Sequence, residues 1–263
     1  MAPLFSDAGR RRLDDIVRPG MLCVFDFDGT LAPIVTQPDE VRLPPNVLQR
    51  LIELSGRTQI AILTGRSVVD IAPRLEFKVD YLVGNHGLEG VPGWQARSDA
   101  YAAMCRNWKD TLTMALTDPQ YGPGIFLEDK HYSLSVHYRQ ARDQVEAEAR
   151  LKTLLAGLQP PARIVAGKCV FSLMPQDGAD KGSALEELMR ISGASGAIYV
   201  GDDVTDEDVF RLNRDDLLSV RVEHASDSNA EFFVHGHQEI EQLLDELIER
   251  LRKHQGNASS RSE

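Results

Sequence analysis

A short apolar run, residues 21–25, ends in the sequence Asp26-Phe27-Asp28-Gly29-Thr30-Leu31. An uninterrupted apolar run of this length is typical of a strand that is buried on both faces, as in a parallel sheet. Asp26 and Asp28 are two residues apart, so their side chains can point into the same pocket. Two neighbouring acids repel each other unless a cation or a proton offsets the repulsion. The sequence therefore predicts a site at the end of this strand.

The segments on either side alternate between strand and helix patterns. A helix is indicated at residues 44–54, with Pro at its start and Gly56 after its end. We expect a further helix capped by Ser67 with Asp70 three residues on. The later helices are expected at residues 181–191, 205–213 and 238–253, and the strands at 59–64, 79–83, 197–200 and 217–222. This alternation predicts an α/β fold with a doubly wound, Rossmann-like parallel sheet.

The middle of the chain breaks this alternation. Between residues 133 and 139 polar and apolar residues alternate, which is typical of an antiparallel sheet with one packed face. The other elements expected here are helices at 99–116 and 141–158, strand character from 125 to 139, and strands at 163–166 and 169–174. We therefore predict an inserted α+β domain at residues 99–175, and a core domain formed by residues 1–98 and 176–263.

Composition narrows the possible partners and location. The net charge of −11 argues against nucleic acid, whose binding proteins usually carry a basic face. No apolar stretch approaches the ~20 residues that a membrane span needs. The three cysteines are far apart, as expected for free thiols in a reducing compartment: Cys23, Cys105 and Cys169. We expect a cytoplasmic protein, monomeric or weakly oligomeric, that binds a small molecule and neither nucleic acid nor membrane.

Polar residues follow several of the predicted strands, at the edge where a parallel sheet presents its ligands. Acids at these positions offer the hard oxygen ligands that Mg²⁺ prefers: Asp26, Asp28 and Asp202. Thr64 and Lys181 add a hydroxyl group and a cation that can bind phosphoryl oxygens. Together these groups predict a site for phosphoryl transfer.

Each of these residues also has a structural interpretation when it is taken alone. Asp26 and Asp28 are good turn formers, and Thr64 with Gly65 could simply end a strand. Thr205 has the pattern of a helix N-cap, so Asp206 and Glu207 could stabilise the start of that helix. Lys181 could be a solvated surface residue.

Four motifs in this order resemble those of the haloacid dehalogenase superfamily phosphatases. They are Asp26 to Leu31, Thr64-Gly65-Arg66, Asp180-Lys181-Gly182 and the acidic run from Gly201 to Glu207. Together with residues 84–89 and 133–139, the last motif resembles the trehalose-6-phosphate phosphatase family. The resemblance covers about residues 22–231, and the insertion matches that family's cap domain.

The resemblance implies a haloacid dehalogenase core and a role for each catalytic residue. Asp26 would form an aspartyl phosphate, and Asp28 would act first as an acid and then as a base. Thr64 and Lys181 would bind the phosphoryl group. Mg²⁺ would be held by Asp26, the backbone carbonyl of Asp28, and Asp202.

The resemblance also implies which residues contact the substrate. Glu128 and Lys130, two apart on a predicted strand, share one face and would bind sugar hydroxyls. On a later strand this chain has Ser172 and Met174 where the family has Glu and Arg, and a serine can still hydrogen bond a hydroxyl group. Further residues expected to line the site are Gly65, Arg66, His86, His137 and Arg139.

The activity implied by the resemblance is hydrolysis of trehalose 6-phosphate to trehalose and phosphate. Two alternatives stay open from the residues. One is a phosphatase for another sugar phosphate, such as sucrose 6-phosphate or a glucosyl-polyol phosphate, with Ser172 as the reason. The other is a sugar-phosphate sensor without catalytic activity, which would have no use for both Asp26 and Asp28.

Overall fold

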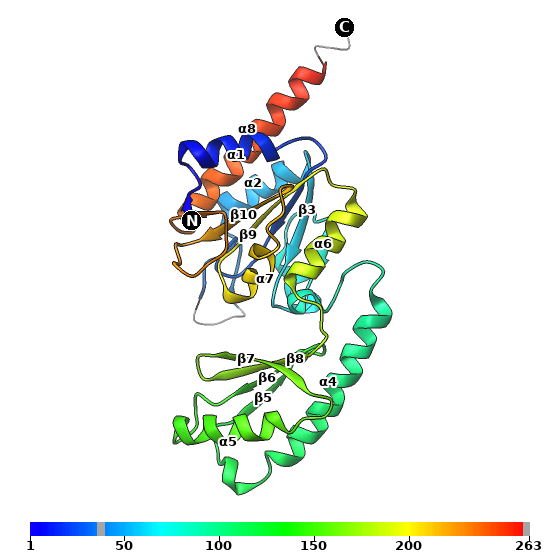
Figure 1. Ribbon diagram of the computed structural model, residues 1–263, viewed down its shortest axis with the longest axis vertical. Coiled ribbons are helices and arrows are strands. Elements are labelled where there is room, and N and C mark those ends of the chain that lie inside the picture. The colour runs from blue at the N-terminus through cyan, green and yellow to red at the C-terminus, as the bar shows by residue number, and fades with distance from the viewer. Residues whose placement is uncertain (36–39, 260–263) are drawn as a thin grey trace. The chain divides into compact units, whose positions relative to one another are not determined.

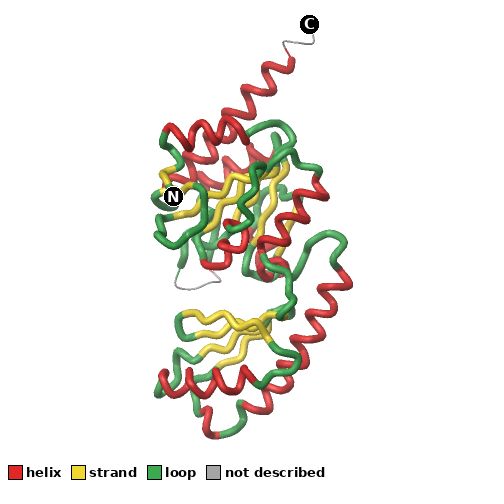
Figure 2. Tube along the Cα trace, in the orientation of Figure 1, coloured by secondary structure: helices red, strands yellow, loops and turns green. Residues whose placement is uncertain are grey.

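The computed structural model describes residues 1–35 and 40–259, with side chains as far as residue 255. The chain divides into two compact units: unit 1 is Met1–Pro92 with Ala179–Glu263, and unit 2 is Gly93–Gly178. The insertion predicted at residues 99–175 lies inside unit 2. Figures 1 and 2 show the helices and strands of each unit.

Unit 1 is built around a parallel sheet whose described strands follow the order β1-β11-β10-β9-β2-β3-β4. The strand bounds are β1 (Ala2–Pro3), β2 (Leu22–Phe25), β3 (Gln59–Leu63), β4 (Tyr81–Val83), β9 (Ala197–Gly201), β10 (Leu217–Val222) and β11 (Phe232–Val234). From β2 the chain builds one half of the sheet outward through β3 and β4, and after unit 2 it builds the other half through β9, β10 and β11. The predicted doubly wound α/β fold is confirmed.

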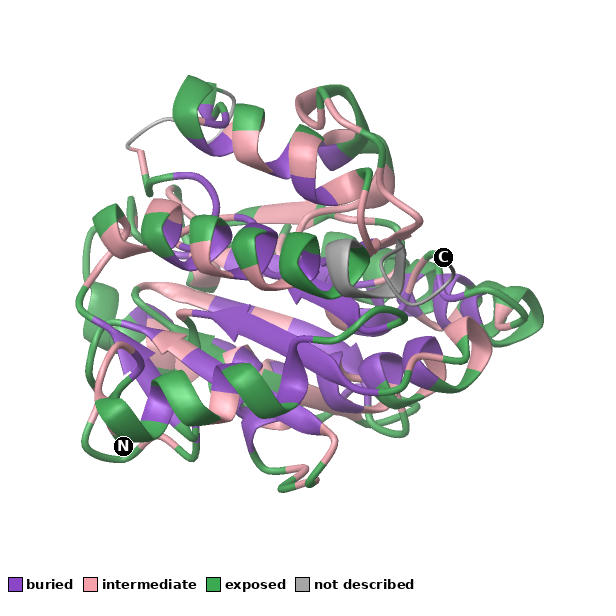
Figure 3. Cartoon of the chain, turned by 90° about the horizontal axis from the view of Figure 1, so that it is seen from above, coloured by how far each residue is buried: buried purple, intermediate pink, exposed green. Residues whose placement is uncertain are grey.

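Helices cover both faces of this sheet. One face packs on α1 (Asp7–Ile16), α2 (Pro45–Ser55) and α8 (Gln238–Ser259) in a single apolar core that includes Phe25, Ile62 and Val200. The other face carries α6 (Lys181–Ser192) and α7 (Glu207–Phe210), where the ring of Tyr199 packs edge-on against Phe210. Figure 3 shows the central strands as buried between these layers. The short elements of unit 1 are α3 (Val68–Ile71), η2 (Ala72–Arg74), η3 (Asn85–Gly87) and η5 (Val204–Asp206).

The N-terminal segment is part of unit 1. Sequence patterns did not indicate β1, α1 or β11. The two strands are too short to show a periodicity, and α1 buries only three residues, Gly9, Leu13 and Ile16. Arg10 forms an ion pair with Glu246 of α8, and Arg12 forms one with Glu231 beside β11. The basic residues of α1 therefore attach this helix to α8 and to the segment before β11.

Unit 2 contains a four-stranded antiparallel sheet in the order β5-β6-β8-β7. Its elements are α4 (Gln95–Ala115), η4 (Pro119–Tyr121), β5 (Phe126–Asp129), β6 (Leu134–His137), α5 (Gln144–Ala156), β7 (Ala162–Gly167) and β8 (Val170–Pro175). One face of the sheet packs on α4 and α5 through a core that includes Trp108, Val136, Leu151 and Phe171. The opposite face carries the polar residues of the alternating pattern predicted from the sequence. The α+β character predicted for the insertion is confirmed.

None of the helices described in either unit is long and apolar enough to cross a membrane.

Candidate active site

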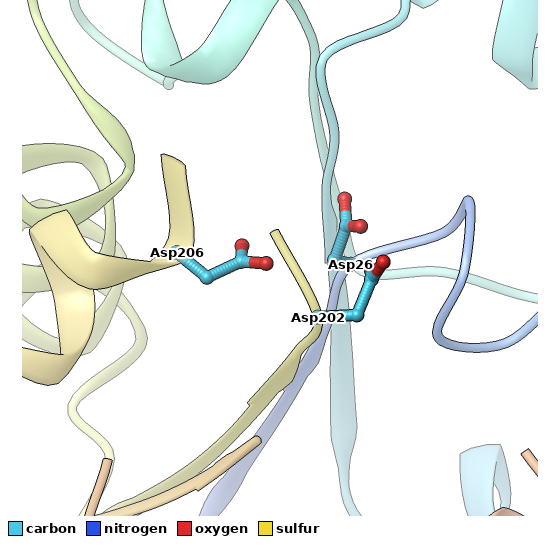
Figure 4. A group of neighbouring side chains, drawn as sticks. All are labelled: Asp26, Asp202 and Asp206. Carbon is cyan, nitrogen blue, oxygen red and sulfur yellow. The ribbon is translucent and has the colours of Figure 1, made fainter. Parts of the chain in front are cut away.

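The candidate site lies at the carboxyl ends of β2 and β9, where the two halves of the parallel sheet of unit 1 meet. These strands are direct neighbours, with Phe25 opposite Val200. Asp26 follows β2 and Asp202 follows β9, so the topology places the two carboxylates side by side (Figure 4). In doubly wound sheets a crevice at such a switch point is the usual place for a ligand.

Lys181 links two buried acids beside these strand ends. Its Nζ atom donates to Asp26 Oδ1 at 2.9 Å and to Asp206 Oδ1 at 2.7 Å. The lysine side chain is 1% exposed, so the interpretation as a solvated surface residue is wrong. Burial opposes its charge, but the carboxylates of Asp206 and Asp26 outweigh burial and raise its pKa. Lys181 is therefore a fixed cation beside Asp26.

Asp206 was predicted to stabilise a helix start, and the structure adds hydrogen bonds from three residues to its carboxylate. Besides Lys181, its carboxylate accepts from the Tyr199 hydroxyl at 2.5 Å and from the backbone N–H of Asp203 at 2.8 Å. Burial opposes ionisation of Asp206, but Lys181 and these donors lower its pKa. The predicted N-cap at Thr205 is wrong: the cap of η5 is Asp203, which exchanges hydrogen bonds with Asp206. The sequence signal was the spacing Asp203-x-x-Asp206, which fits a capping pair as well as Thr205-x-x-Asp208 does.

Three carboxylates of the site could hold a metal ion. Asp26, Asp202 and Asp206 each have an oxygen within 4.8 Å of the others. Burial raises the pKa of Asp26 well above its usual value. Burial, followed by the charge of Asp206, raises the pKa of Asp202 to about 6. A divalent cation would relieve both effects, because it stabilises the ionised carboxylates that are its ligands.

The loop after β2 is shaped to bring its backbone against Asp202. Gly29 has a φ of 82°, and a Cβ atom at this position would lie 2.1 Å from Asp202 Oδ2. The Thr30 hydroxyl donates to Asp202 Oδ1 at 3.0 Å. Only glycine combines this conformation with so close an approach. The Gly-Thr pair of the motif thus positions Asp202.

The carboxylate of Asp28 pairs with Arg66 and not with Lys181. Arg66 Nε donates to Asp28 Oδ2 at 2.6 Å, and Arg66 Nη2 donates to Asp28 Oδ1 at 2.7 Å. The side chain of Asp28 is therefore not part of the three-carboxylate cluster. Its predicted contact with a metal through the backbone carbonyl remains a prediction.

Thr64, Gly65 and His86 lie together after β3. Thr64 is 1% exposed, and its hydroxyl accepts from the backbone N–H of Arg66 at 3.2 Å. A Cβ atom on Gly65 would lie 2.4 Å from His86 Cε1, so the imidazole packs directly over this glycine. His86 has a φ of 57°, and its backbone N–H donates to the carbonyl of Thr64 at 2.9 Å. The predicted lining residues of unit 1 are thus brought together.

The segment that contains His86 is fixed by Glu89. Its Oε2 atom accepts from Asn85 Nδ2 at 2.8 Å and from the backbone N–H of Val68 at 2.9 Å. Glu89 therefore connects η3 to the start of α3, which begins two residues after Arg66.

The residues predicted to bind sugar lie in unit 2, on the face of its sheet opposite α4 and α5. Glu128 is aligned with Ser135, and Ser135 with Ser172, so these three side chains cross the sheet in one row. Glu128 Oε2 lies 2.8 Å from His137 Nε2, and Lys130 Nζ lies 4.0 Å from Glu128 Oε1. Arg163 is aligned with Met174, and its Nη2 lies 3.6 Å from the methionine sulfur.

Comparison with known proteins points to one family. The family model described as Trehalose-phosphatase matches residues 24–238. A trehalose-phosphate phosphatase of Mycobacterium tuberculosis is 32% identical over 253 residues, which is 91% of this chain and 64% of that protein. The corresponding protein of Mycobacterium leprae is 32% identical over 231 residues, 82% of this chain and 54% of that protein. The chain thus spans less than two thirds of the length of these relatives.

Solved structures show the same fold. The C-terminal domain of trehalose-6-phosphate phosphatase from C. albicans has a TM-score of 0.71 at 22% identity, covering 95% of this chain and 99% of that chain. A trehalose-6-phosphate phosphatase related protein has a TM-score of 0.68 at 24% identity, covering 87% of this chain and 97% of that chain. The sucrose-phosphatase of Synechocystis sp. PCC6803, solved with sucrose and phosphate, has a TM-score of 0.55 at 18% identity, covering 87% and 99%.

Proposed function

The chain belongs to the trehalose-phosphatase family, and on that basis we propose that it is a Mg²⁺-dependent phosphoric monoester hydrolase that converts trehalose 6-phosphate to trehalose and phosphate. The observation that carries this proposal is the buried ion pair of Lys181 and Asp26 beside the carboxylate of Asp202. It combines a nucleophile, a fixed cation and a second acid at one edge of the sheet, which is what phosphoryl transfer needs.

In the first step, a carboxylate oxygen of Asp26 attacks phosphorus and the bond from phosphorus to the sugar oxygen breaks. Asp28 gives its proton to the departing oxygen, which leaves as the sugar hydroxyl. Lys181 and the Thr64 hydroxyl bind the phosphoryl oxygens while charge develops on them. The products of this step are free sugar and an aspartyl phosphate on Asp26.

In the second step, water attacks the phosphorus of the aspartyl phosphate. Asp28, now ionised, takes a proton from the water, and the bond from phosphorus to the Asp26 oxygen breaks. Inorganic phosphate leaves, and Asp26 returns as a carboxylate while Asp28 returns protonated.

The donors present in the crevice suit Mg²⁺. Asp26, Asp202 and the backbone carbonyl of Asp28 would hold the ion, since all three offer hard oxygen ligands. Asp206 is a weaker candidate because Lys181, Tyr199 and Asp203 already donate to its carboxylate. When bound, Mg²⁺ supplies positive charge against the phosphoryl oxygens.

The choice of sugar depends on residues of unit 2. Glu128, Lys130 and Ser172 remain predicted contacts to the sugar. Ser172 favours the second candidate, a phosphatase for sucrose 6-phosphate or a glucosyl-polyol phosphate, because the shorter uncharged side chain changes the hydrogen bonds that are offered. A sensor without activity is the third candidate.

The cysteines support the proposed cytoplasmic location. All three are free thiols, and burial raises the pKa of Cys105 to about 12. A buried thiol such as that of Cys105 stays protonated and unreactive at neutral pH.

Phosphate release from a panel of sugar phosphates in Mg²⁺ tests the proposal. We expect trehalose 6-phosphate to have the highest kcat/KM, and Asp26→Asn to lower the rate at least about 10³-fold, because the nucleophile is removed. Asp216→Asn, at an acid paired with Arg214 on the surface, is the matched control and should leave the rate unchanged.

Two outcomes separate the candidates, and a third tests the nucleophile. Highest turnover of sucrose 6-phosphate or a glucosyl-polyol phosphate would support the second candidate. Binding of sugar phosphates without any turnover would support the sensor. Wild-type rates in Asp26→Asn would overturn the proposed nucleophile.

A further inference from the structure

The two acids of Asp26-x-Asp28 are held by two separate cations. Asp26 Oδ1 accepts from Lys181, whereas both oxygens of Asp28 accept from Arg66. The Arg66 contact is a fork of two parallel hydrogen bonds, at 2.6 and 2.7 Å. Such a pair fixes the rotation of a carboxylate as well as its position, which the single ammonium of a lysine cannot do.

The guanidinium of Arg66 is itself held by Asp70, on the side away from Asp28. Its remaining nitrogen, Nη1, donates to Asp70 Oδ2 at 2.7 Å. Arg74 Nη2 donates to the other oxygen of Asp70 at 2.7 Å, and Arg74 Nε donates to the Asp70 carbonyl at 3.1 Å. Charges therefore alternate along a chain of four side chains: Arg74, Asp70, Arg66 and Asp28.

The local sequence explains why these four charged side chains lie in a row. Arg66, Asp70 and Arg74 are four residues apart, the spacing that places side chains on one face across the turn formed by α3 and η2. The Ser67 hydroxyl caps α3 by accepting from the backbone N–H of Asp70 at 3.3 Å. Asp70 was predicted to complete a capping box with Ser67, but its carboxylate faces the two arginines instead. The segment after β3 is therefore built to present a guanidinium to Asp28.

Burial makes this row of ion pairs more rigid than an ion pair on the surface. The side chains of Arg66 and Arg74 are 13% and 10% exposed, whereas Asp28 is 35% exposed. The row of charges thus begins at the buried Arg74 and ends at the partly exposed carboxylate of Asp28, which a ligand can still reach. Partly buried bidentate pairs in a network hold geometry that isolated surface pairs do not.

We infer that Arg66 is a positioning residue that fixes the orientation of the Asp28 carboxyl group, and that Asp70 and Arg74 position Arg66. This inference rests on the proposed function, in which Asp28 gives its proton to the sugar oxygen as the bond from phosphorus to that oxygen breaks and the bond to Asp26 forms. A misplaced carboxyl group slows that transfer even when substrate binding is intact.

Leaving groups of different basicity test the inference. A sugar alkoxide needs a proton in order to leave, whereas p-nitrophenolate does not. The ratio kcat/KM reports only the steps up to release of the leaving group, so it is independent of hydrolysis of the aspartyl phosphate. We propose to measure kcat/KM for trehalose 6-phosphate, or the best sugar phosphate of the panel, and for p-nitrophenyl phosphate.

Arg66→Lys keeps the charge and removes the fork. We expect it to lower kcat/KM at least about tenfold for the sugar phosphate, and less than about threefold for p-nitrophenyl phosphate. The larger loss is a part of the roughly 10²- to 10⁴-fold rate increase that general acid catalysis contributes. Asp70→Asn should show the same selectivity with a smaller loss. Asp28→Asn should show the largest selective loss, and Arg66→Lys added to Asp28→Asn should cost nothing further, because both act through one carboxyl group.

The control is Arg57→Lys, at an arginine paired with Glu53 on α2, which should leave both substrates unaffected. The inhibition constant of inorganic phosphate should be unchanged in Arg66→Lys. An increase in that constant, with equal losses for both substrates, would show that Arg66 binds the phosphoryl group and would overturn the inference. Equal losses with unchanged phosphate inhibition would overturn it in favour of a general structural role. If the wild-type protein hydrolyses neither substrate, the proposed function fails first.

Discussion

Buried charged residues of the site each have an identifiable partner. Lys181 pairs with Asp26 and Asp206, and the Asp206 carboxylate accepts further hydrogen bonds from Tyr199 and Asp203. A charge that is removed from water needs such donors, because an unpaired buried ion is costly. At the scale of single residues, the site is thus a network in which each member fixes the next.

The hydroxyl group of Tyr199 should contribute to this network. Burial, followed by the charge of Asp206, raises the pKa of Tyr199 well above its usual value, so the hydroxyl remains a donor. Tyr199→Phe removes only that donor. We expect it to lower the free energy of unfolding by about 1 to 3 kcal/mol, since a buried carboxylate loses one of its hydrogen bonds.

Urea denaturation measures this change. Tyr81→Phe, at a partly exposed tyrosine of β4, is the comparison. A loss for Tyr199→Phe no larger than that for Tyr81→Phe would contradict the expectation.

Glu207 joins three elements of unit 1. Glu207 Oε2 accepts from the backbone N–H and from the side chain of Asn229, each at 2.9 Å. Glu207 Oε1 lies 3.4 Å from Arg221 Nη1, which also donates to the carbonyl of Asp203 at 3.2 Å. The start of α7 is thereby attached to β10 and to the segment before β11, and the loop that carries Asp202 is held in place.

The pH dependence of stability should reveal this contact. Burial opposes ionisation of Glu207, but hydrogen bonds from Ser228 and Asn229 outweigh it and lower its pKa. The unfolded chain therefore binds more protons than the folded protein as this group titrates. The stabilisation is fully present above the unfolded pKa of ~4.3, and it is lost as the pH falls through the lower folded pKa.

Glu207→Gln keeps the size of the side chain and removes its negative charge, and with it the pH-dependent stabilisation. We expect a loss of about 1 to 3 kcal/mol in the free energy of unfolding at neutral pH, and a smaller difference from the wild type below about pH 4. Denaturant unfolding at several pH values measures it. A difference between the two proteins that is constant with pH would contradict the assignment to ionised Glu207.

At the level of elements, sequence patterns found most of the parallel sheet but not its outer strands. The strand predicted at residues 217–222 agrees with β10, and the helix predicted at 181–191 with α6 (Lys181–Ser192). The long helix α4 begins at Gln95, before the predicted start at residue 99. Strands β1 and β11 were missed because two or three residues carry no periodicity, and only pairing with a neighbour makes them strands.

For the molecule as a whole, a bound metal ion should stabilise the fold. The raised pKa values of Asp26 and Asp202 mean that their ionised forms destabilise the folded state when no cation is present. Mg²⁺ should therefore increase the Tm of the wild-type protein relative to EDTA. At an ion concentration of about 100 times Kd, binding increases the free energy of unfolding by about 2.7 kcal/mol.

Asp202→Asn tests the site of this effect. The side-chain oxygen of Asn can still accept from Thr30, and the negative charge is gone. We expect the variant to unfold at a higher temperature than the wild type in EDTA, and to gain less from Mg²⁺. Scanning calorimetry under both conditions measures this, and an equal Mg²⁺ shift in both proteins would place the metal elsewhere.

The sequence by itself determined the α/β class, the insertion and the strand ends that carry polar residues, because these depend on local periodicity and on the order of segments. Asp26, Thr64, Lys181 and Asp202 were identified in this way. Only the tertiary structure decided which charge pairs with which. It placed Arg66 on Asp28, Tyr199 on Asp206 and Lys181 between Asp26 and Asp206. The physical reason is that pairing of buried charges depends on distances between side chains from different strands, which no sequence spacing encodes.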